Sequence, residues 1–194
     1  MKPKNILQNT LLSALLILLS SLSLQAMELG DVSLAGNGCY GSTIITPVSA
    51  VRGRISLPVR ASLNKKAGLA SFERSTCNIR IPVKLAPNEK LQILDVAQSV
   101  RLSVSAGAEV KSNLNLTLVG RRTPDLTLVV KAEDNNITTA KVLKTEKSVV
   151  IAESNCGQDT IIAGNLSLLA VGQSGASATT SSVKVTLKVL SCEE

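Results

Sequence analysis

Four cysteines, Cys39, Cys77, Cys156 and Cys192, carry the clearest chemistry in this sequence of 194 residues. In an exported chain, which residues 1–26 indicate, an even number of cysteines favours disulfides because compartments outside the cytoplasm are oxidising. Four cysteines allow three pairings, and sequence order alone does not choose among them. We favour Cys39 with Cys77 and Cys156 with Cys192, because each pair closes a loop in one half of the chain.

Metal binding and thiol catalysis are the alternative uses of these cysteines. The chain has no Cys-x-x-Cys pair and no histidine that could complete a zinc shell. Without an imidazole, a catalytic cysteine lacks its usual base, and Ser-His-Asp machinery cannot be built. We therefore expect two disulfides, no metal site, no cofactor and no catalytic residue of these kinds.

Carboxylates and Ser-Lys pairs are the remaining routes to catalysis. Glu133 and Asp134 are adjacent, so on a strand they would point to opposite faces, and the two asparagines that follow favour a turn. Asp134, Asn136 and Asp159 supply only part of the oxygen set that calcium needs. Serine and lysine are plentiful, but nothing marks a particular pair. A hydrolase of either kind remains an alternative to a protein without enzymatic activity.

Five arginines form a candidate anion-binding set, namely Arg52, Arg54, Arg60, Arg121 and Arg122. The alternation places the arginines that lie in strands on the solvent-exposed face. The competing interpretation is that they are ordinary surface charges that serve solubility. The partner that such a set would bind is an anionic polymer of the envelope or matrix. Because Tyr40 and Phe72 are the only aromatic residues, nucleic-acid binding by stacking and sugar binding on aromatic platforms are both disfavoured.

Residues 1–26 have the layout of a secretory signal peptide. Lys2 and Lys4 form a positive start, Leu11 to Leu24 are mostly apolar, and Ala26 ends the segment with a small residue. A membrane anchor would need about 20 consecutive apolar residues, and this stretch is shorter and interrupted by serines. We expect cleavage after Ala26, which leaves one domain, residues 27–194, secreted or periplasmic and without a transmembrane segment.

Aliphatic and polar residues alternate with a period of two along the remaining chain, which predicts strands. The alternation is clearest at 54–63, 79–85 and 183–189, and further strand candidates are 43–48, 91–96, 100–104, 110–119, 126–132, 148–152 and 166–171. Turn-forming clusters separate them. Many short strands indicate a sandwich or barrel, and we predict an all-β, single-domain antiparallel β-sandwich with an aliphatic core and two disulfides.

Three local features modify this pattern. Pro58 and Pro82 interrupt strand patterns, so each is expected on a sheet edge or at a bulge. The run from Gly172 to Ser182 is rich in serine, threonine and glycine and is interpreted as a long hairpin loop. The segment from Val142 to Glu146 is too short to assign.

Several blocks match, in order and spacing, a known group of secreted proteins. They are Gly36-Asn37-Gly38-Cys39, then Arg74 to Ile79 before a strand containing proline, then Leu91 to Gly120, then Ser154-Asn155-Cys156-Gly157, and a last strand that closes on Cys192. Over most of residues 27–194 the chain resembles the small secreted four-cysteine domain-of-unknown-function family forty-three sixty. The resemblance implies a secreted β-rich fold and no established activity. The family's aromatic residue before the last cysteine is replaced here by Val189-Leu190-Ser191.

These observations favour a non-enzymatic extracytoplasmic β-sandwich that acts by binding or as a structural part of an envelope or matrix. An adhesive or fibre-forming surface subunit is the first alternative, because aliphatic strands can pair edge to edge or accept a donor strand. The hydrolase that uses carboxylates or a Ser-Lys pair is the second.

Overall fold

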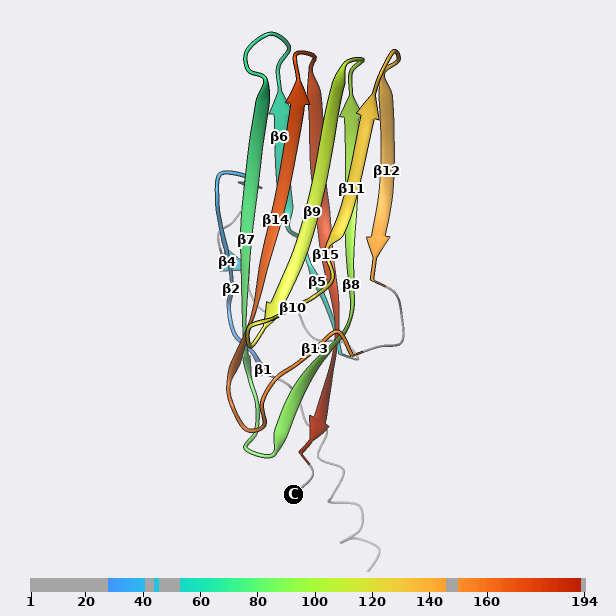
Figure 1. Ribbon diagram of the computed structural model, residues 1–194. Helices are drawn as coiled ribbons and strands as arrows, with labels where there is room; N and C mark the ends of the chain where they lie inside the picture. The colour runs from blue at the N-terminus through green and yellow to red at the C-terminus, as the bar shows by residue number, and fades with distance from the viewer. Residues whose placement is uncertain (1–27, 41–43, 46–52, 146–149, 193–194) are drawn as a thin grey trace, which may run out of the picture.

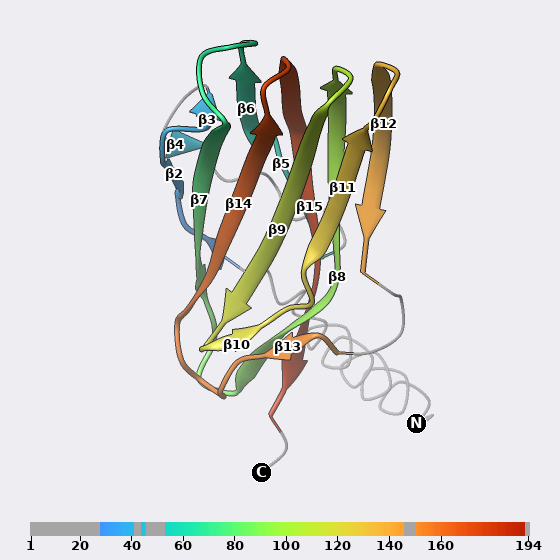
Figure 2. The same ribbon diagram turned by 45° about the horizontal axis from the view of Figure 1, so that its top comes forward.

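The structure is a computed structural model that describes residues 28–40, 44–45, 53–145 and 150–192. The expected signal peptide, residues 1–26, lies outside these ranges. Strands of the described chain form two antiparallel sheets that face each other as a sandwich (Figures 1 and 2). No helix in these ranges has the length and apolar character needed to cross a membrane.

One sheet has eight strands, in the order β10-β9-β14-β7-β2-β4, with β1 also paired to β7 and β11 to β9. Its members are β1 (Glu28–Leu29), β2 (Val32–Ala35), β4 (Ile44–Ile45), β7 (Phe72–Lys84), β9 (Ala108–Leu118), β10 (Arg121–Arg122), β11 (Leu126–Ala132) and β14 (Thr160–Gly172). The long strands β7, β14 and β9 form its centre.

The other sheet has seven strands, in the order β12-β8-β15-β6-β3, with β13 also paired to β8 and β5 to β15. Its members are β3 (Cys39–Tyr40), β5 (Arg54–Leu57), β6 (Arg60–Lys65), β8 (Glu89–Val104), β12 (Ile137–Lys144), β13 (Ala152–Glu153) and β15 (Ala176–Ser191). The prediction of an all-β antiparallel sandwich is confirmed.

Four turns at one end of the sandwich, uppermost in Figure 1, each carry the chain from one sheet to the other. They are residues 66–71, 105–107, 133–136 and 173–175. Hydrogen bonds join neighbouring turns: Gly68 N donates to Gln173 O at 2.9 Å, and Gly107 N donates to Glu133 O at 3.1 Å. Because the strands joined by these four turns lie in different sheets, they do not pair with each other, and the long strands β8, β14 and β15 pair with partners that are distant in the sequence.

The space between the sheets is filled by aliphatic side chains. The largest fully buried ones come from both sheets and are Ile55, Leu57, Ile79, Ile81, Leu91, Ile93, Leu102, Leu114, Leu116, Leu118, Ile162 and Leu166. Each such burial contributes about 1.5–3 kcal/mol. The expectation of an aliphatic core needs one correction, because Gln98 of β8 is also fully buried. Its Nε2 donates to Ser112 Oγ of β9 at 2.9 Å and to Thr180 Oγ1 of β15 at 3.1 Å, so this polar contact links the two sheets.

Both favoured disulfides are present. Cys39–Cys77 joins β3 of the seven-stranded sheet to β7 of the eight-stranded sheet, with a Cα–Cα distance of 4.9 Å. Cys156–Cys192 joins the loop after β13 to the chain end of β15, with a Cα–Cα distance of 6.1 Å. One bridge therefore connects the two layers, and the other holds the chain at the end opposite the four turns.

The predicted long loop from Gly172 to Ser182 is wrong. β14 ends at Gly172 and β15 already begins at Ala176, so the turn is only residues 173–175. Ala176, Ala178 and Thr180 point inward and are buried, while the serines and threonines between them face outward. The period of two is present, but alanine and threonine give it little contrast in hydrophobicity.

Residues 91–96 and 100–104, predicted as two strands, belong to the single strand β8. Its pairing with β15 shifts register at two places, between Thr180 and Ser182 and between Thr186 and Leu187. Leu94 and Ser181 are the residues without a direct partner there. Each such bulge reverses the phase of the alternation in the strand that carries it. The gap between the two predicted strands has another cause, because the inward-facing residue there is the polar Gln98.

Other predicted strands differ from the observed ones in the residues at which they begin or end. Of 43–48, the structure describes only the two residues of β4, and of 148–152 it describes 150–152, with β13 at Ala152–Glu153. The unassigned segment from Val142 overlaps β12, which ends at Lys144. The candidate 166–171 extends to the whole of β14, and 110–119 becomes Ala108–Leu118.

Both prolines lie where a neighbouring strand is interrupted. Pro58 separates β5 from β6 beside the bulge of β15 at Ser181. Pro82 lies inside β7, and its carbonyl accepts a hydrogen bond of 2.9 Å from the nitrogen of Gly30, which separates β1 from β2. In an antiparallel ladder a residue's N–H and C=O point to the same side. The missing N–H of Pro82 therefore faces a gap between strands, and no ladder bond is lost.

We predict that the two disulfides differ in their contribution to stability. Their loops are similar, with sequence separations of 38 and 36 residues, so the chain-entropy term is about 4 kcal/mol for each. Cys77 is fully buried and Cys156 is exposed. Replacing Cys39 and Cys77 by alanine should therefore lower the free energy of unfolding more than replacing Cys156 and Cys192, because the first pair also leaves a cavity. Urea denaturation of both variants measures this, and the reverse order would contradict it.

Gly164 should be the least replaceable residue of β14. A Cβ at this position would lie 2.7 Å from Leu116 Cδ2 and 3.2 Å from Ile79 Cβ, inside the core. We expect Gly164→Ala to lower the free energy of unfolding by about 1–3 kcal/mol through overpacking. The control Ala163→Ser, on the exposed face of the same strand, should change it by less than about 0.5 kcal/mol. Equal effects of the two changes in urea denaturation would refute this packing argument.

A basic face on the seven-stranded sheet

The structure separates the arginines of the predicted anion-binding set. Arg54 of β5 and Arg60 of β6 are exposed on the outer face of the seven-stranded sheet, since their neighbours Ile55 and Ala61 are buried. Arg121 and Arg122 form β10, which belongs to the eight-stranded sheet. Arg52 lies outside the described residues. The set is therefore not one surface: two of its members share a face, and two belong to the opposite sheet.

Arg121 and Arg122 are close to carboxylates. Arg122 forms an ion pair of 2.9 Å with Asp125. Arg121 contributes, as the smallest of several causes, to lowering the pKa of Glu153, which places it near β13. These local partners reduce the attraction that either arginine offers to a further anion.

Four other cations share the outer face with Arg54 and Arg60. Lys184 and Lys188 come from β15, Arg101 from β8 and Lys144 from β12, and all four are exposed. We call the six residues Arg54, Arg60, Arg101, Lys144, Lys184 and Lys188 the basic face. Strand order places all six on one outer face, and Arg101, opposite Thr179, is nine residues along β15 from Lys188.

The register shows how close these cations are. Arg54 lies opposite Thr186, so Lys184 and Lys188 flank it at two residues on either side along β15. Lys184 and Lys144 both lie opposite Ala97 of β8, from its two sides. Neighbouring strands are about 4.8 Å apart, and two residues along a strand span about 6.7 Å. Arg54 is therefore about 8 Å from Lys184 and from Lys188, and Lys184 is about 10 Å from Lys144. These separations are close to the Debye length at physiological ionic strength, roughly 8 Å.

Acidic groups on this face are scarce. Among the described residues of this outer face, two carboxylates have other partners. Asp95 lies opposite Thr186, and its Oδ1 accepts a hydrogen bond of 3.1 Å from Thr145 Oγ1. Glu153 lies opposite Gln92, which in turn lies opposite Lys188, and it forms an ion pair of 3.1 Å with Lys90. None of the six cations forms an ion pair with another described residue. The face therefore presents positive charge that is not neutralised within the described chain.

A shallow depression of about 420 Å³ lies on the same outer surface, at the bulge of β15. Its lining includes Arg101, Lys141 and the hydroxyl residues Ser99, Thr179 and Ser181. Hydroxyls and cations side by side can donate hydrogen bonds to anionic oxygens.

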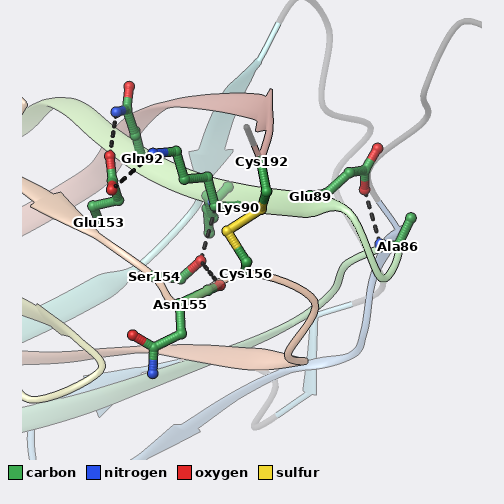
Figure 3. Close-up of a disulfide and its surroundings, with 10 residues drawn as sticks. Ala86, Glu89, Lys90, Gln92, Glu153, Ser154, Asn155, Cys156 and Cys192 are labelled. Carbon is green, nitrogen blue, oxygen red and sulfur yellow. Dashed lines mark hydrogen bonds and ion pairs between the residues drawn. A yellow bond between two sulfur atoms is a disulfide. The ribbon is translucent and has the colours of Figure 1, made fainter. Parts of the chain in front are cut away.

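The end of the sandwich near the second disulfide carries a separate polar cluster (Figure 3). Glu153 of β13 accepts hydrogen bonds from Gln92 and, at 3.1 Å, from Lys90, both on β8. Ser154 Oγ accepts a hydrogen bond of 2.9 Å from the nitrogen of Leu91 and donates one of 2.9 Å to Asn155 O. These contacts attach the segment that leads to Cys156 onto β8, so we assign the cluster a structural role.

The acidic residues considered for calcium binding lie apart. Asp134 and Asn136 are in a turn at one end of the sandwich, where Asn136 Oδ1 accepts a hydrogen bond of 3.0 Å from the nitrogen of Ala106. Asp159 lies in the loop before β14, at the opposite end, and accepts from the nitrogen of Leu85 at 3.2 Å. In the described chain no three Cys, Asp or Glu residues are grouped so that they could hold a metal ion.

Sequence reasoning identified Arg54 and Arg60 but missed the other four residues of the basic face. Lys184 and Lys188 were recognisable as the wet side of their strand from the alternation. What the sequence did not provide was the order of the strands, which places β15 between β5 and β8.

A scan against models of known protein families found no match, so the resemblance to family forty-three sixty stays an expectation. A search of curated proteins also found none.

Among solved structures, the chain is similar to the carbohydrate-binding module TmCBM61 in complex with β-1,4-galactotriose, with 7% identity, a TM-score of 0.28, and coverage of 86% of this chain and 89% of that one. A family 11 carbohydrate-binding module from Clostridium thermocellum shows 6% identity, a TM-score of 0.24, and coverage of 84% and 98%. The glycoside hydrolase domain Endo-D from Streptococcus pneumoniae shows 11% identity, a TM-score of 0.23, and coverage of 82% and 21%. Identities and TM-scores this low support no conclusion about ligand or activity.

We predict a pH-dependent contribution of Glu153 to stability. Its hydrogen bonds with Gln92, and then with Lys90, lower the pKa of its carboxyl group. A lowered folded-state pKa stabilises the fold above the unfolded pKa, and this stabilisation is lost as the pH falls through the folded value. At pH 7, Glu153→Gln should therefore unfold at lower denaturant concentration than wild type, by less than about 1 kcal/mol. The difference should shrink in acid, below the ordinary pKa of glutamate, and urea titrations at several pH values would reveal it. A difference that stays constant with pH would contradict the assignment.

Proposed function

We propose that this protein is a non-enzymatic extracytoplasmic binding protein that attaches through its basic face to an anionic polymer of the cell envelope or extracellular matrix. The observation that carries the proposal is the gathering of six cations from β5, β6, β8, β12 and β15 on one outer face. Two carboxylates, Asp95 and Glu153, lie on this face among the described residues, and Glu153 already forms an ion pair with Lys90.

The shape of this face favours a polymer over a small anion. The cations are spread over five strands, and the depression beside Arg101 is shallow and open, so a small ligand would contact few of them at once. A chain with repeated carboxylate, sulfate or phosphate groups engages several cations together. Each further contact is then intramolecular, which raises the overall affinity without any single strong site.

Two further observations support the extracytoplasmic and non-enzymatic parts of the proposal. Paired disulfides persist in oxidising compartments and are rare in the cytosol. The sequence has no histidine, the side chain that serves most often as a general acid or base at neutral pH.

The fibre-forming alternative finds less support. β12 is the outermost strand of the seven-stranded sheet, next to β8, and it carries the exposed lysines Lys141 and Lys144. Charged residues on an edge strand, especially lysines, oppose pairing with the edge of another molecule.

The proposal predicts salt-dependent binding to an acidic polysaccharide such as polygalacturonate. At low salt, changing Arg54, Arg101, Lys184 and Lys188 to glutamine should weaken binding about tenfold or more, since each exposed ion pair contributes roughly 0.2–1 kcal/mol. Binding by the wild type should fall steeply as salt rises, because the attraction is screened. Co-sedimentation or biolayer interferometry would measure both effects.

A matched control changes four cations on the opposite sheet, Arg74, Arg80, Lys111 and Lys131, to glutamine. Its net charge equals that of the first variant, and it should retain binding within about threefold if the basic face is the site. Equal weakening by both variants would show that the net charge of the protein, and not the basic face, determines binding, and this would overturn the proposal. Binding to anionic phospholipid vesicles without binding to the polysaccharide would also overturn it.

A further inference from the structure

Three asparagines form a straight row across the outer face of the eight-stranded sheet. Asn165 of β14 lies directly opposite Asn78 of β7 on one side and directly opposite Asn115 of β9 on the other. Their neighbours along the strands, such as Leu114 and Leu166, are buried, so the three amides point away from the core. We call Asn78, Asn165 and Asn115 the amide row. It lies on the side of the molecule opposite the basic face.

Hydrogen bonds hold these amides in fixed orientations. Asn165 Nδ2 donates to Asn78 Oδ1 at 2.7 Å, and Asn115 Nδ2 donates to Asn113 Oδ1 at 3.3 Å. Asn113 Nδ2 in turn donates to Thr127 Oγ1 of β11 at 2.7 Å and to Asp125 Oδ2 at 3.1 Å. These bonds form two groups, one joining β7 to β14 and the other joining β9 to β11 and Asp125. Both groups preorganise the surface, which lowers the cost of ordering side chains when a ligand binds.

Each amide of the row keeps hydrogen-bonding capacity toward solvent. Within the described part of the chain, Asn78 Nδ2, Asn165 Oδ1 and Asn115 Oδ1 have no hydrogen-bond partner. An asparagine amide offers two donors and an acceptor, so the row presents donors at one end and acceptors in the middle and at the other end. A hydroxyl group both donates and accepts, and neighbouring hydroxyls of a sugar ring can bond to such a series.

The row lies on the floor of two adjoining depressions. One, of about 530 Å³, includes Phe72, Arg74 and Ser167 in its lining, and the other, of about 570 Å³, includes Asn78 and Thr117. They share Asn115 and Asn165, so together they form one shallow groove over the centre of the sheet.

Phe72 gives this groove an apolar end. It is the only phenylalanine of the chain, and 63% of it is exposed, opposite the exposed Val171 of β14. An exposed aromatic ring does not contribute its apolar surface to the core. It offers a flat apolar face on which the C–H side of a sugar ring can pack. Phe72 and Asn78 are six residues apart on one strand, about 20 Å, so the groove has room for several sugar units.

We infer that this groove is a second binding site, for a neutral, hydroxyl-rich glycan chain that the amide row and Phe72 recognise together. An extended peptide commonly binds by pairing with the free edge of a sheet. The groove lies over β14, whose backbone is already paired with β7 on one side and with β9 on the other. Single-stranded nucleic acid would need several stacking platforms, and this face has one aromatic residue. The site goes beyond the proposed function, because it uses the other sheet and uncharged groups.

The test is affinity gel electrophoresis of the intact protein against soluble galactan, mixed-linkage glucan, xylan and mannan, in about 0.5 M salt. Salt at this level screens the attraction of the basic face beyond about 4 Å, so that any retardation is independent of the proposed function. We expect at least one glycan to retard the wild type, and the glutamine variant of the basic face to be retarded equally.

Two variants test the residues that carry the inference, and a third is their control. Asn115→Ala with Asn165→Ala should weaken binding about tenfold or more through lost hydrogen bonds, and Phe72→Ala should weaken it severalfold through lost stacking. Ser103→Ala with Ser177→Ala, a matched polar pair on the outer face of the other sheet, should leave it unchanged. Urea denaturation checks that each variant is folded.

The inference is overturned if no glycan of the panel retards the wild type, or if the double asparagine variant binds as well as the wild type. It is also overturned if retardation disappears in high salt, because the lysines and arginines around the groove would then account for it. Failure of the polygalacturonate experiment alone would leave this site intact, since the two experiments use different faces, probes and salt concentrations.

Discussion

The layer of aliphatic side chains between the two sheets is the interaction on which the other features of the structure depend. Leucine, isoleucine and valine from both sheets fill it, and it contains no aromatic side chain among the described residues. Because side chains alternate along a strand, burying one face of each long strand fixes which residues face solvent on the other. The two outer faces, one basic and one lined by amides, are therefore set by the same constraint that stabilises the fold.

The turns at the end of the sandwich decide which outward residues become neighbours. Each of the four turns crosses between sheets, so strands that are consecutive in sequence never lie side by side there. As a result, Arg54 lies beside a strand that carries Lys184, and the amide row combines Asn78, Asn115 and Asn165. Both surfaces are assembled from segments that are far apart in the chain.

This explains how far the sequence could predict the structure. The fold class and the exposure of Arg54 and Arg60 follow from the alternation, which is visible in one chain. The disulfide pairing was a preference among three possibilities, and the structure contains the favoured pairs. Arg121 and Arg122 were grouped with Arg54 and Arg60 because strand order is not visible. The loop predicted over 172–182 was wrong for a different reason, since buried alanines and threonines differ little in hydrophobicity from their exposed neighbours.

The placement of the two surfaces on opposite outer faces has a consequence for how they work together. A close-packed aliphatic layer separates them, and packed interiors adopt discrete arrangements and do not deform continuously. Within that layer, Gln98 Nε2 bonds to Ser112 and Thr180, and Gln98 Oε1 has no hydrogen-bond partner in the described chain. Binding on one face should therefore leave affinity on the other unchanged. If both proposed sites bind their ligands, the sandwich would hold two polymers on opposite sides, and its rigid core would set their separation.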